Sequence, residues 1–427
     1  MISAETAYIL AGMPNNDIVV MKFGGTSVAD AERIKRAARR IVDKREAGFS
    51  VVAVLSARGK TTDELIAMAQ TISADPDPRE MDMLLSSGER ISCALCAIAI
   101  NDLGHRAISL TGSQAGIVTD DSHTKARILD VRADRVKAAL DEDSIVLVAG
   151  FQGVSSTAKN VTTLGRGGSD TTAVAVAAAL GAQECEIYTD VAGVYTADPR
   201  IVPDARKLST ISFEEMLEMA ASGAGVLQLR AVEYARNHGV RIHCRSSFDE
   251  EPGTVVLEAG TMEQPLITAV THSTDEARVT LVGVPDELGA AARIFAALAE
   301  ANVNVDMIVQ NEPTTAGGLA EISFTVPRED LRVSQAALAP LTGEAFAAMT
   351  THEEMGKVSI IGAGMRSHPG VAAKVFSVLA EEGVNIEMIA TSPIKISCVI
   401  DRARVAGAVQ VLHAAFELSG PGTSIPE

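Results

Sequence analysis

Two glycine-rich segments combine residue types that bind phosphate and carboxylate groups. The first, KFGGTS (22–27), follows a strand-like run and precedes an amphipathic helix that is predicted to begin near Asp30. Glycines let the backbone approach phosphate oxygens, amides at a helix start point toward an anion, and Lys22 supplies a point charge. Taken alone this turn is a modest signal, because tight glycine turns after strands are common for structural reasons.

The second segment, TTLGRGGSDTT (162–172), precedes an alanine-rich stretch whose lack of polar residues predicts a buried helix. We expect Ser169 or Asp170 to cap this helix. Arg166 is suited to binding a carboxylate through two parallel hydrogen bonds. A capped helix after a structural glycine loop is the weaker interpretation, because hydroxyl, guanidinium and carboxylate groups are so dense here. A third segment, YTDVAGVYTADPR (188–200), is by itself only a polar loop at a strand end.

The elements that must position these segments alternate between strands and helices over residues 17–260. The strand-like runs are IVVMKF (18–23), VVAVLS (51–56), IVLVAGF (145–151), CEIYTD (185–190) and RIHCRSS (241–247). Several are apolar on both faces, as expected for strands that are covered on both sides. The first helix is predicted to run from an N-cap at Asp30 to a C-cap at Gly48. The pattern predicts a layered α/β domain with a largely parallel sheet.

The remainder of the chain contains a repeat. Residues 279–311 and 358–392 resemble each other, and Gly289 and Gly370, Phe295 and Phe376, and Asn304 and Asn385 correspond, each pair 81 residues apart. Such a fixed offset indicates duplicated modules. Each copy reads strand, glycine-bearing turn, helix and strand, followed by more strand-like sequence, an order that suits a ferredoxin-like βαββαβ unit. Two packing modules without a ligand remain an alternative.

Composition excludes several classes of protein. The chain has 427 residues, 47% hydrophobic and 22% charged, which fits two or three globular domains. Its net charge of −18 disfavours binding to nucleic acid and to anionic membranes. The basic run 35–45 has apolar residues at helical spacing and is interpreted as a solvated helix face. No apolar run reaches membrane-spanning length, and no signal peptide is evident.

Cysteine usage indicates a reducing, cytoplasmic setting. There are five cysteines, an odd number without the spacing of a disulfide framework. Cys93 and Cys96 form a CxxC pattern inside a segment that reads as a buried helix. Packed core thiols are therefore favoured over a zinc or redox site.

Taken in order, the motifs KFGGTS, SSGERIS, GSQAG, VAGFQG, TTLGRGGSDTTA, YTDVAGVYTADPR and VEYAR resemble those of aspartate kinases in the amino-acid kinase superfamily. The resemblance extends through two C-terminal repeats that are similar to ACT domains, from about Asp17 to Leu418, and is strongest to the single-activity actinobacterial form. It implies a kinase domain at 17–260 and ACT-like modules at 261–345 and 346–427. Residues 1–16 form an extension without an assigned role.

The resemblance also implies roles for individual residues. The catalytic residues would be Lys22 and Asp170, with Asp170 orienting Lys22. The aspartate-binding residues would be Ser27, Ser56, Thr62, Glu89 at the substrate ammonium, Arg166 at its α-carboxylate, and Ser169. The nucleotide-binding residues would be Lys22, Gly24, Gly25, Thr189, Asp190, Tyr195, Pro199 and Arg200. The regulatory residues would be Asp286, Asn304, Gln310, Asn311 and Asn385.

The implied reaction fits these residue types. A substrate carboxylate is already ionised at neutral pH, so transfer of the ATP γ-phosphoryl group to it needs positioning and charge neutralisation rather than a general base. Mg²⁺ would arrive with ATP, and no dedicated protein cage for it is evident. The product would be 4-phospho-L-aspartate, at the first step of the pathway to lysine and threonine.

This sequence departs from the family pattern at a few positions. Gly225 stands where a nucleotide-contacting lysine is usual, which predicts either weaker ATP binding or a compensating charge elsewhere. Ala192 replaces a frequent but variable aspartate. Pro313 and Ala320 replace small polar residues in the first repeat. Leu288 and Pro393 replace a usual proline and a frequent glutamate. These changes predict weakened feedback by lysine, threonine or both. The alternative is neutral drift, with effector binding kept by backbone contacts.

The resemblance implies an even-numbered homo-oligomer, or association with a short ACT-only chain that starts near Met262. Two other functions stay open. One is a kinase for glutamate or for an aspartate analogue, since Glu89 and Arg166 recognise an α-amino acid without fixing its length. The other is a non-catalytic amino-acid sensor, against which the retention of Lys22, Arg166 and Asp170 argues.

Overall fold

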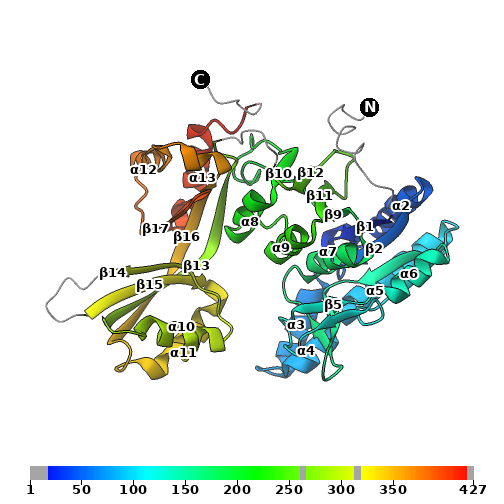
Figure 1. Cartoon of the computed structure of the whole chain (residues 1–427), viewed down its shortest axis with the longest axis horizontal. Coiled ribbons are helices and arrows are strands. Elements are labelled where there is room, and N and C mark those ends of the chain that lie inside the picture. Colours follow the sequence, from blue (N-terminus) through cyan, green and yellow to red (C-terminus); the bar gives the residue numbers. More distant parts are fainter. Residues whose placement is uncertain (1–17, 260–265, 312–318, 421–427) are drawn as a thin grey trace. The chain divides into compact units, whose positions relative to one another are not determined.

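The computed structural model describes residues 18–259, 266–311 and 319–420, which divide into two compact units (Figure 1). The first unit contains the described residues up to 194, together with 207–220 and 225–259. The second contains 195–206, 221–224 and the described residues from 266 onward. The predicted extension 1–16 and Met262 lie outside the described residues. The predicted boundary at 260 divides the chain differently, because two short segments before it pack with the second unit.

A large sheet forms the centre of the first unit. Over the described residues its eight strands run in the order β10-β12-β11-β9-β1-β2-β6-β3. Their bounds are β1 Ile18–Phe23, β2 Ser50–Leu55, β3 Ala107–Leu110, β6 Ile145–Ala149, β9 Glu184–Thr189, β10 Thr210–Ser212, β11 Arg241–Ser246 and β12 Thr254–Leu257. All neighbours are parallel except β11 and β12. The prediction of a largely parallel sheet is confirmed, and the five predicted strands are the consecutive strands β11-β9-β1-β2-β6.

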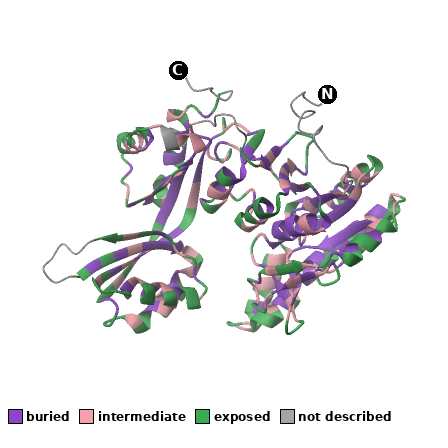
Figure 2. Cartoon of the chain, viewed as in Figure 1, coloured by how far each residue is buried: buried purple, intermediate pink, exposed green. Residues whose placement is uncertain are grey.

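Helices cover both faces of this sheet. The helices of this unit are α2 Ala31–Glu46, α3 Thr61–Ile72, α4 Pro78–Leu85, α5 Ser87–Asp102, α6 Asp134–Asp141, α7 Gly168–Leu180, α8 Phe213–Ala221 and α9 Leu229–His238, with a 3-10 turn η1 Gly25–Val28. Helices α2 and α5 share a core with Met21 and Phe23 of β1, whereas α7 packs on the opposite face. Burial therefore runs through the middle of the unit (Figure 2).

The first helix shows how local sequence sets these elements. The carboxylate of Asp30 accepts a hydrogen bond from Arg33 N at 2.9 Å, so the predicted N-cap is confirmed. Ile34, Ala37, Ala38, Ile41 and Val42 are buried along one stripe, as the spacing predicts. The helix ends at Glu46 with Ala47 as its C-cap, one residue before the predicted Gly48.

A smaller sheet that was not predicted adjoins the glycine-rich loop. Its order is β5-β4-β7-β8, with bounds β4 Ile117–Thr119, β5 Ile128–Val131, β7 Gln152–Ser155 and β8 Val161–Thr163. Three or four residues give too short an alternation to identify such strands from sequence. Strand β8 leads directly into the loop that carries Arg166.

The second unit is built on one six-stranded sheet in its described residues, in the order β14-β15-β13-β16-β18-β17. The strands are β13 Ala269–Pro285, β14 Asp306–Asn311, β15 Leu319–Pro327, β16 Ala348–Ile361, β17 Met388–Ser392 and β18 Lys395–Asp401. The helices are α10 Ala290–Glu300, α11 Leu331–Leu338, α12 Val371–Glu381 and α13 Val405–Ala415, with 3-10 turns η2 Arg328–Asp330, η3 Ala339–Leu341, η4 Ala363–Ser367 and η5 Arg402–Arg404. Two βαββαβ modules are present, as predicted.

The repeat offset has a backbone cause. Gly289 and Gly370 each precede a helix with φ of +92° and +100°, in the left-handed region that favours glycine. Helices α10 and α11 share one apolar core with β15, and α12 and α13 share another with β18. The corresponding glycines therefore start equivalent helices in the two modules.

The two modules are not consecutive stretches of chain. The first half of β13, from Ala269 to Ser273, pairs with the second half of β16, and the later half of β13 pairs with the first half of β16. Strand β13 thus supplies an edge to the second module's sheet before the first module begins. The predicted division at 345/346 does not include this exchange, because pairing between distant strands is not encoded in local periodicity.

Residues Pro78–Asp102, which include α4 and α5, meet the length and composition of a membrane span. Half of the most apolar window is nevertheless buried within the protein, and α5 contributes Cys93 and Cys96 to the core beneath the sheet. We therefore interpret Pro78–Asp102 as a helical segment of the protein core. Both thiols are free, and burial raises the pKa of Cys96 to about 12, so the predicted packed core thiols are confirmed.

Candidate active site

The candidate site lies at the carboxyl edge of the large sheet. Pairing aligns Phe23 with Leu55 and Tyr188, and Leu55 with Ala149, so β1, β2, β6 and β9 end together. The segments that follow these strands are therefore neighbours. Ligands of open α/β sheets bind at this edge.

Lys22 and Asp170 form an ion pair at this edge. The distance from Lys22 Nζ to Asp170 Oδ1 is 2.6 Å, and the two side chains are 12% and 8% exposed. Lys22 comes from β1, whereas Asp170 lies in the first turn of α7. The structure thus brings together the two residues predicted to be catalytic.

The predicted capping of α7 by Ser169 or Asp170 is wrong. The helix begins at Gly168, and its N-cap is Gly167, whose φ of +68° is left-handed and which makes no side-chain cap bond. Ser169 and Asp170 already lie within the first turn, and Asp170 turns its carboxylate toward Lys22 instead. A Cβ at Gly167 would lie 1.9 Å from Gln228 Cγ, so close packing also requires glycine there.

The KFGGTS turn is packed tightly against the segment that follows β2. A Cβ at Gly25 would lie 2.8 Å from the carbonyl oxygen of Ala57, so no larger residue fits without movement. Gly24 N donates to Tyr188 O at 3.2 Å. A contribution of this amide to phosphate binding would require that bond to be given up. The side chain of Lys22 lies beside this turn, 3.5 Å from where a Cβ of Gly24 would be.

Glu89 brings a buried carboxylate to the same edge. It lies in α5, is 3% exposed, and accepts a hydrogen bond from Ala57 N at 3.1 Å through Oε1. Its other oxygen, Oε2, is buried and has no hydrogen-bond partner among the described residues. Burial raises the pKa of Glu89 to about 7. An unpartnered buried acceptor of this kind is suited to a ligand that carries donors or positive charge.

The remaining residues predicted to bind the substrate differ in how far they are buried. Ser27 is buried and its hydroxyl lies 2.6 Å from that of Ser247, which sequence analysis did not single out although it directly follows β11 at this edge. Ser56 N donates to Phe23 O at 3.1 Å. Thr62 is half-buried in α3, and Arg166 is exposed in its loop. Ser169 is buried, and a Cβ at Gly150 would meet its hydroxyl at 2.8 Å.

The predicted nucleotide residues are divided between the two units. Thr189 and Asp190 end β9 in the first unit, where the Thr189 hydroxyl donates to Asp190 at 3.2 Å. Tyr195, Pro199 and Arg200 belong to the second unit. Arg200 there binds the carboxylate of Asp198, with Nη2 at 2.7 Å from Oδ2. The role of these five residues in nucleotide binding stays a prediction.

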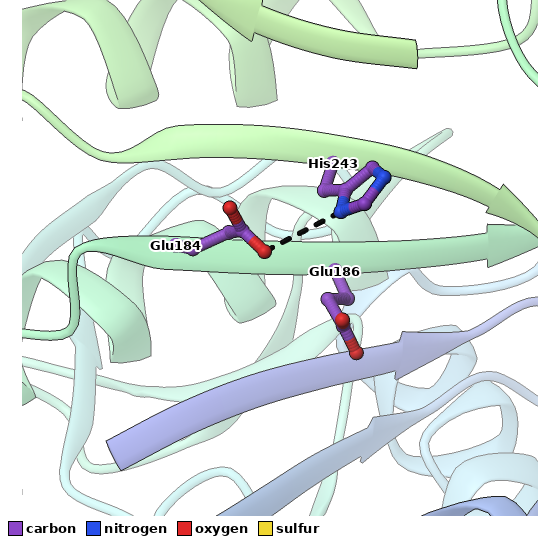
Figure 3. A group of neighbouring side chains, drawn as sticks. All are labelled: Glu184, Glu186 and His243. Carbon is purple, nitrogen blue, oxygen red and sulfur yellow. Dashed lines mark hydrogen bonds and ion pairs between the residues drawn. The ribbon is translucent and has the colours of Figure 1, made fainter. Parts of the chain in front are cut away.

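A cluster of Glu184, Glu186 and His243 has ligand atoms within 4.8 Å of one another (Figure 3). Glu184 and His243 point toward each other at 3.4 Å, and Glu186 already binds Lys44 Nζ at 2.7 Å and the hydroxyl of Tyr188 at 2.9 Å. Ile187 pairs with Lys22, so the two side chains lie on the same face of the sheet. Glu184 and Glu186 alternate with Ile187 along β9, and His243 pairs with Glu186, so all three lie on the other face. The cluster therefore does not supply a metal site beside Lys22.

The predicted regulatory residues all lie at the surface of the second unit. Asp286, Asn304, Gln310, Asn311 and Asn385 are exposed. Asn311 lines a cavity of about 590 Å³ on the sheet face, together with Arg278 and Glu387, which form an ion pair at 2.9 Å. Asn385 reaches the same carboxylate, donating to Glu387 Oε1 at 3.1 Å. Polar groups from both modules thus meet on one face.

The Glu89 carboxylate predicts how binding of an ammonium group depends on pH. Only the ionised form attracts a cation, so KM for an α-amino acid should fall as the pH rises to about 7 and level off above it. Below that value KM should rise about tenfold per pH unit. Steady-state kinetics between pH 5.5 and 8.5 measure this dependence, and Glu89→Gln should remove it. The same slope in that variant would assign the titration to another group.

Comparison with known proteins identifies relatives along the whole chain. Residues 17–246 match the amino acid kinase family, and residues 278–343 and 358–416 each match the ACT domain. An aspartokinase of Mycolicibacterium smegmatis is 56% identical over 412 residues, covering 96% of this chain and 98% of that protein. An aspartokinase of Mycobacterium tuberculosis is 55% identical over 94% of this chain and 97% of that protein.

Solved structures agree with these relatives. Escherichia coli aspartokinase III in complex with aspartate and ADP has a TM-score of 0.82 at 28% identity, covering 93% of this chain and 99% of that one. The same enzyme in complex with lysine and aspartate, in its T-state, has a TM-score of 0.70 at 28% identity, covering 94% and 99% of the two chains.

Proposed function

Because the chain belongs to the amino acid kinase family, and within it to the aspartokinases, we propose that it transfers the γ-phosphoryl group of ATP to the β-carboxylate of L-aspartate. The product is a mixed anhydride, 4-phospho-L-aspartate. The observation that carries this proposal is the pairing, at one sheet edge, of the Lys22 turn with the unpartnered carboxylate oxygen of Glu89. They are linked by Ala57, which contacts Glu89 through its amide and approaches Gly25 through its carbonyl.

Some of these residues bind the substrate, and others neutralise charge during the transfer. Glu89 binds the substrate ammonium and Arg166 binds the α-carboxylate, which leaves the β-carboxylate directed at the phosphate. This carboxylate attacks the γ-phosphorus, the bond to the bridging oxygen breaks, and ADP leaves with the electron pair. No proton is abstracted from the nucleophile. Lys22 stabilises charge on the transferring group, and Asp170 orients its ammonium.

A coupled assay of ADP release tests the reaction. With aspartate as acceptor, turnover should require ATP and a divalent cation, and glutamate should be a poor substrate. Equal turnover with glutamate or a β-substituted aspartate would favour the broader carboxylate kinase. Binding of amino acids without any turnover would favour the non-catalytic sensor.

ATP is the phosphoryl donor in this proposal. Thr189, which ends β9, and Asp190, which follows it, contribute to its binding at this edge of the sheet. Mg²⁺ that arrives with ATP would neutralise part of the charge on its phosphates. The strand ends around Lys22 offer Asp170 as the nearest carboxylate, and it is already paired with the lysine. We therefore assign Mg²⁺ to the nucleotide rather than to a protein cage.

Gly225 offers a test of ATP affinity by gain of function. A Cβ at this position would meet no described atom within 4 Å, so a side chain can begin there without steric conflict. We expect Gly225→Lys to lower the KM for ATP by about three- to tenfold, because one partly exposed charge contact contributes about 1 kcal/mol. KM for aspartate should not change. Gly225→Gln is the uncharged control, and an equal gain in that variant would show that charge is not the cause.

Regulation by amino acids is proposed to be weakened in this chain. Pro313 lies outside the described residues. Ala320 is 3% exposed in the core beneath α10, so the hydroxyl that it lacks is missing from a buried position. Leu288 is fully exposed just before α10. Pro393 lies in the turn between β17 and β18, so neither strand loses a hydrogen-bond donor to it.

Inhibition curves measure the strength of feedback. Two missing donors predict an effector affinity reduced tenfold or more, so lysine and threonine at 1 mM, singly or together, should leave most activity. The double reversion Pro313→Ser with Ala320→Thr should restore inhibition. Strong inhibition of the natural sequence by lysine and threonine together at millimolar concentration would show that its feedback is not weakened.

The assembly is also proposed rather than observed. Edge strands of paired ACT modules are commonly hidden by association, which supports a dimer or larger even assembly. An ACT-only chain that begins near Met262 would supply the same modules in trans. A cytoplasmic setting fits the buried, free thiols.

A further inference from the structure

The loop that carries Arg166 is held from two sides by charged side chains that do not belong to the motifs. Asp82, in α4, is fully buried. Arg230, near the start of α9, is part-buried, and burial lowers its pKa. A buried charge is costly unless it is paired or fully hydrogen-bonded, so both require an explanation.

Asp82 accepts hydrogen bonds from three residues on two separate segments. His123 Nδ1 lies 2.6 Å from Oδ2, and Thr124 N donates to the two oxygens at 3.1 and 3.2 Å. The hydroxyl of Thr163, at the end of β8, donates to Oδ1 at 2.5 Å. The carboxylate thereby ties α4 to the strand that leads into the Arg166 loop and to the neighbouring loop.

Arg230 completes the arrangement from the other side. Its Nη1 donates to Leu164 O at 2.7 Å, and its Nη2 donates to Ala126 O at 3.0 Å. Ala126 N in turn donates to Thr163 O at 2.9 Å. The two charged groups therefore act on successive residues, Thr163 and Leu164, immediately before Gly165 and Arg166.

The backbone beside Asp82 and Arg230 includes two residues with positive φ. Thr124 has a φ of +62°, which is uncommon for a residue other than glycine, and its amide is bound by Asp82. Gly165 has a φ of +78°, and a Cβ there would lie 3.2 Å from Thr124 O. The conformation of the loop at Thr124 therefore restricts that of the loop at Gly165. The anchors thus hold the backbone immediately before Gly165 and Arg166.

We propose that Asp82 and Arg230 are positioning residues that fix the Arg166 loop and thereby set the affinity for the substrate α-carboxylate, an inference that rests on the proposed role of Arg166. Neither anchor touches the reacting atoms.

The test separates KM from kcat in matched variants. Asp82→Asn replaces one acceptor oxygen with a donor that faces other donors, and Arg230→Met keeps the apolar stem without the two bonds. Each should raise KM for aspartate about tenfold or more, with KM for ATP and kcat changed less than about threefold. Asp77→Ala is the control, because Asp77 caps the same helix through Arg79 N and Glu80 N without contacting the loop. It should lower the melting temperature and leave both KM values unchanged.

A double-mutant cycle tests whether the anchors act through Arg166. In an Arg166→Ala background, Asp82→Asn should change the aspartate affinity less than about twofold, since the group it positions is already absent. Full additivity, or an unchanged KM in the single variants, would overturn the proposal. If Asp82→Asn does not fold, Thr163→Val and Arg230→Met carry the same cycle. Wild-type enzyme without aspartate turnover would instead refute the proposed function.

Discussion

Replacing Lys22 with alanine is expected to lower kcat by about 10²–10³, the usual effect of removing one preorganised charge from a developing transition state. The ammonium lies beside the glycine turn and is oriented by Asp170 at 2.6 Å. In the proposed mechanism its charge acts on the transferring phosphoryl group, so the loss should appear in kcat as well as in kcat/KM. Initial rates at saturating ATP and aspartate measure it.

Stability must be separated from catalysis in this variant. Removing Lys22 leaves the buried carboxylate of Asp170 without its ion-pair partner, which typically costs about 3–5 kcal/mol in the free energy of unfolding. Rates should therefore be normalised to the folded fraction, and Lys22→Met preserves more of the packing. Lys44→Ala is the matched control, because it breaks an ion pair with buried Glu186 on the other face of the sheet. A Lys22 variant as active as this control would remove the lysine from the mechanism.

Local pattern predicted the centre of the fold well. The five strand-like runs became five adjacent strands, because strands covered on both sides must be apolar on both faces. The 81-residue offset predicted two duplicated modules, and the resemblance identified them as ACT-like. The exchange of strands between them was missed, since it depends on which distant partner pairs with each half of β13. The short strands β4, β5, β7 and β8 also gave no usable alternation.

The site was predictable where chemistry is carried by a compact motif. Lys22 and Asp170 are 148 positions apart, yet each lies in a glycine-rich segment, and the structure joins them. Asp82 and Arg230 gave no such signal, because a single charge in an amphipathic helix reads as solvated until its burial is known. Ser247 was missed as well, although its place after a strand is a clue that the sheet order makes useful.

Replacing Arg166 with alanine is expected to act mainly on binding, raising KM for aspartate by about 10²–10³ while kcat changes little. A bidentate guanidinium–carboxylate contact contributes two charge-assisted hydrogen bonds of about 1.5–3 kcal/mol each. In the proposed mechanism this contact is made equally in the ground state and the transition state, because the α-carboxylate does not react. Arg166→Lys should recover part of the affinity through charge alone. Arg106→Ala, which loses an exposed pair with Glu142, should have no effect.

A truncated substrate shows whether Arg166 contacts the α-carboxylate itself. β-Alanine is aspartate without that group and still offers an ammonium and an acceptor carboxylate. The wild-type enzyme should prefer aspartate over β-alanine by about 10² or more in kcat/KM. In Arg166→Ala this preference should fall to a few-fold, because the contact between Arg166 and the α-carboxylate is already absent and removing the carboxylate costs nothing further. If both enzymes keep the same preference, Arg166 does not bind the α-carboxylate. The analogous pair, succinate with Glu89→Gln, tests the ammonium contact, so the two substitutions together assign each end of the substrate to its residue.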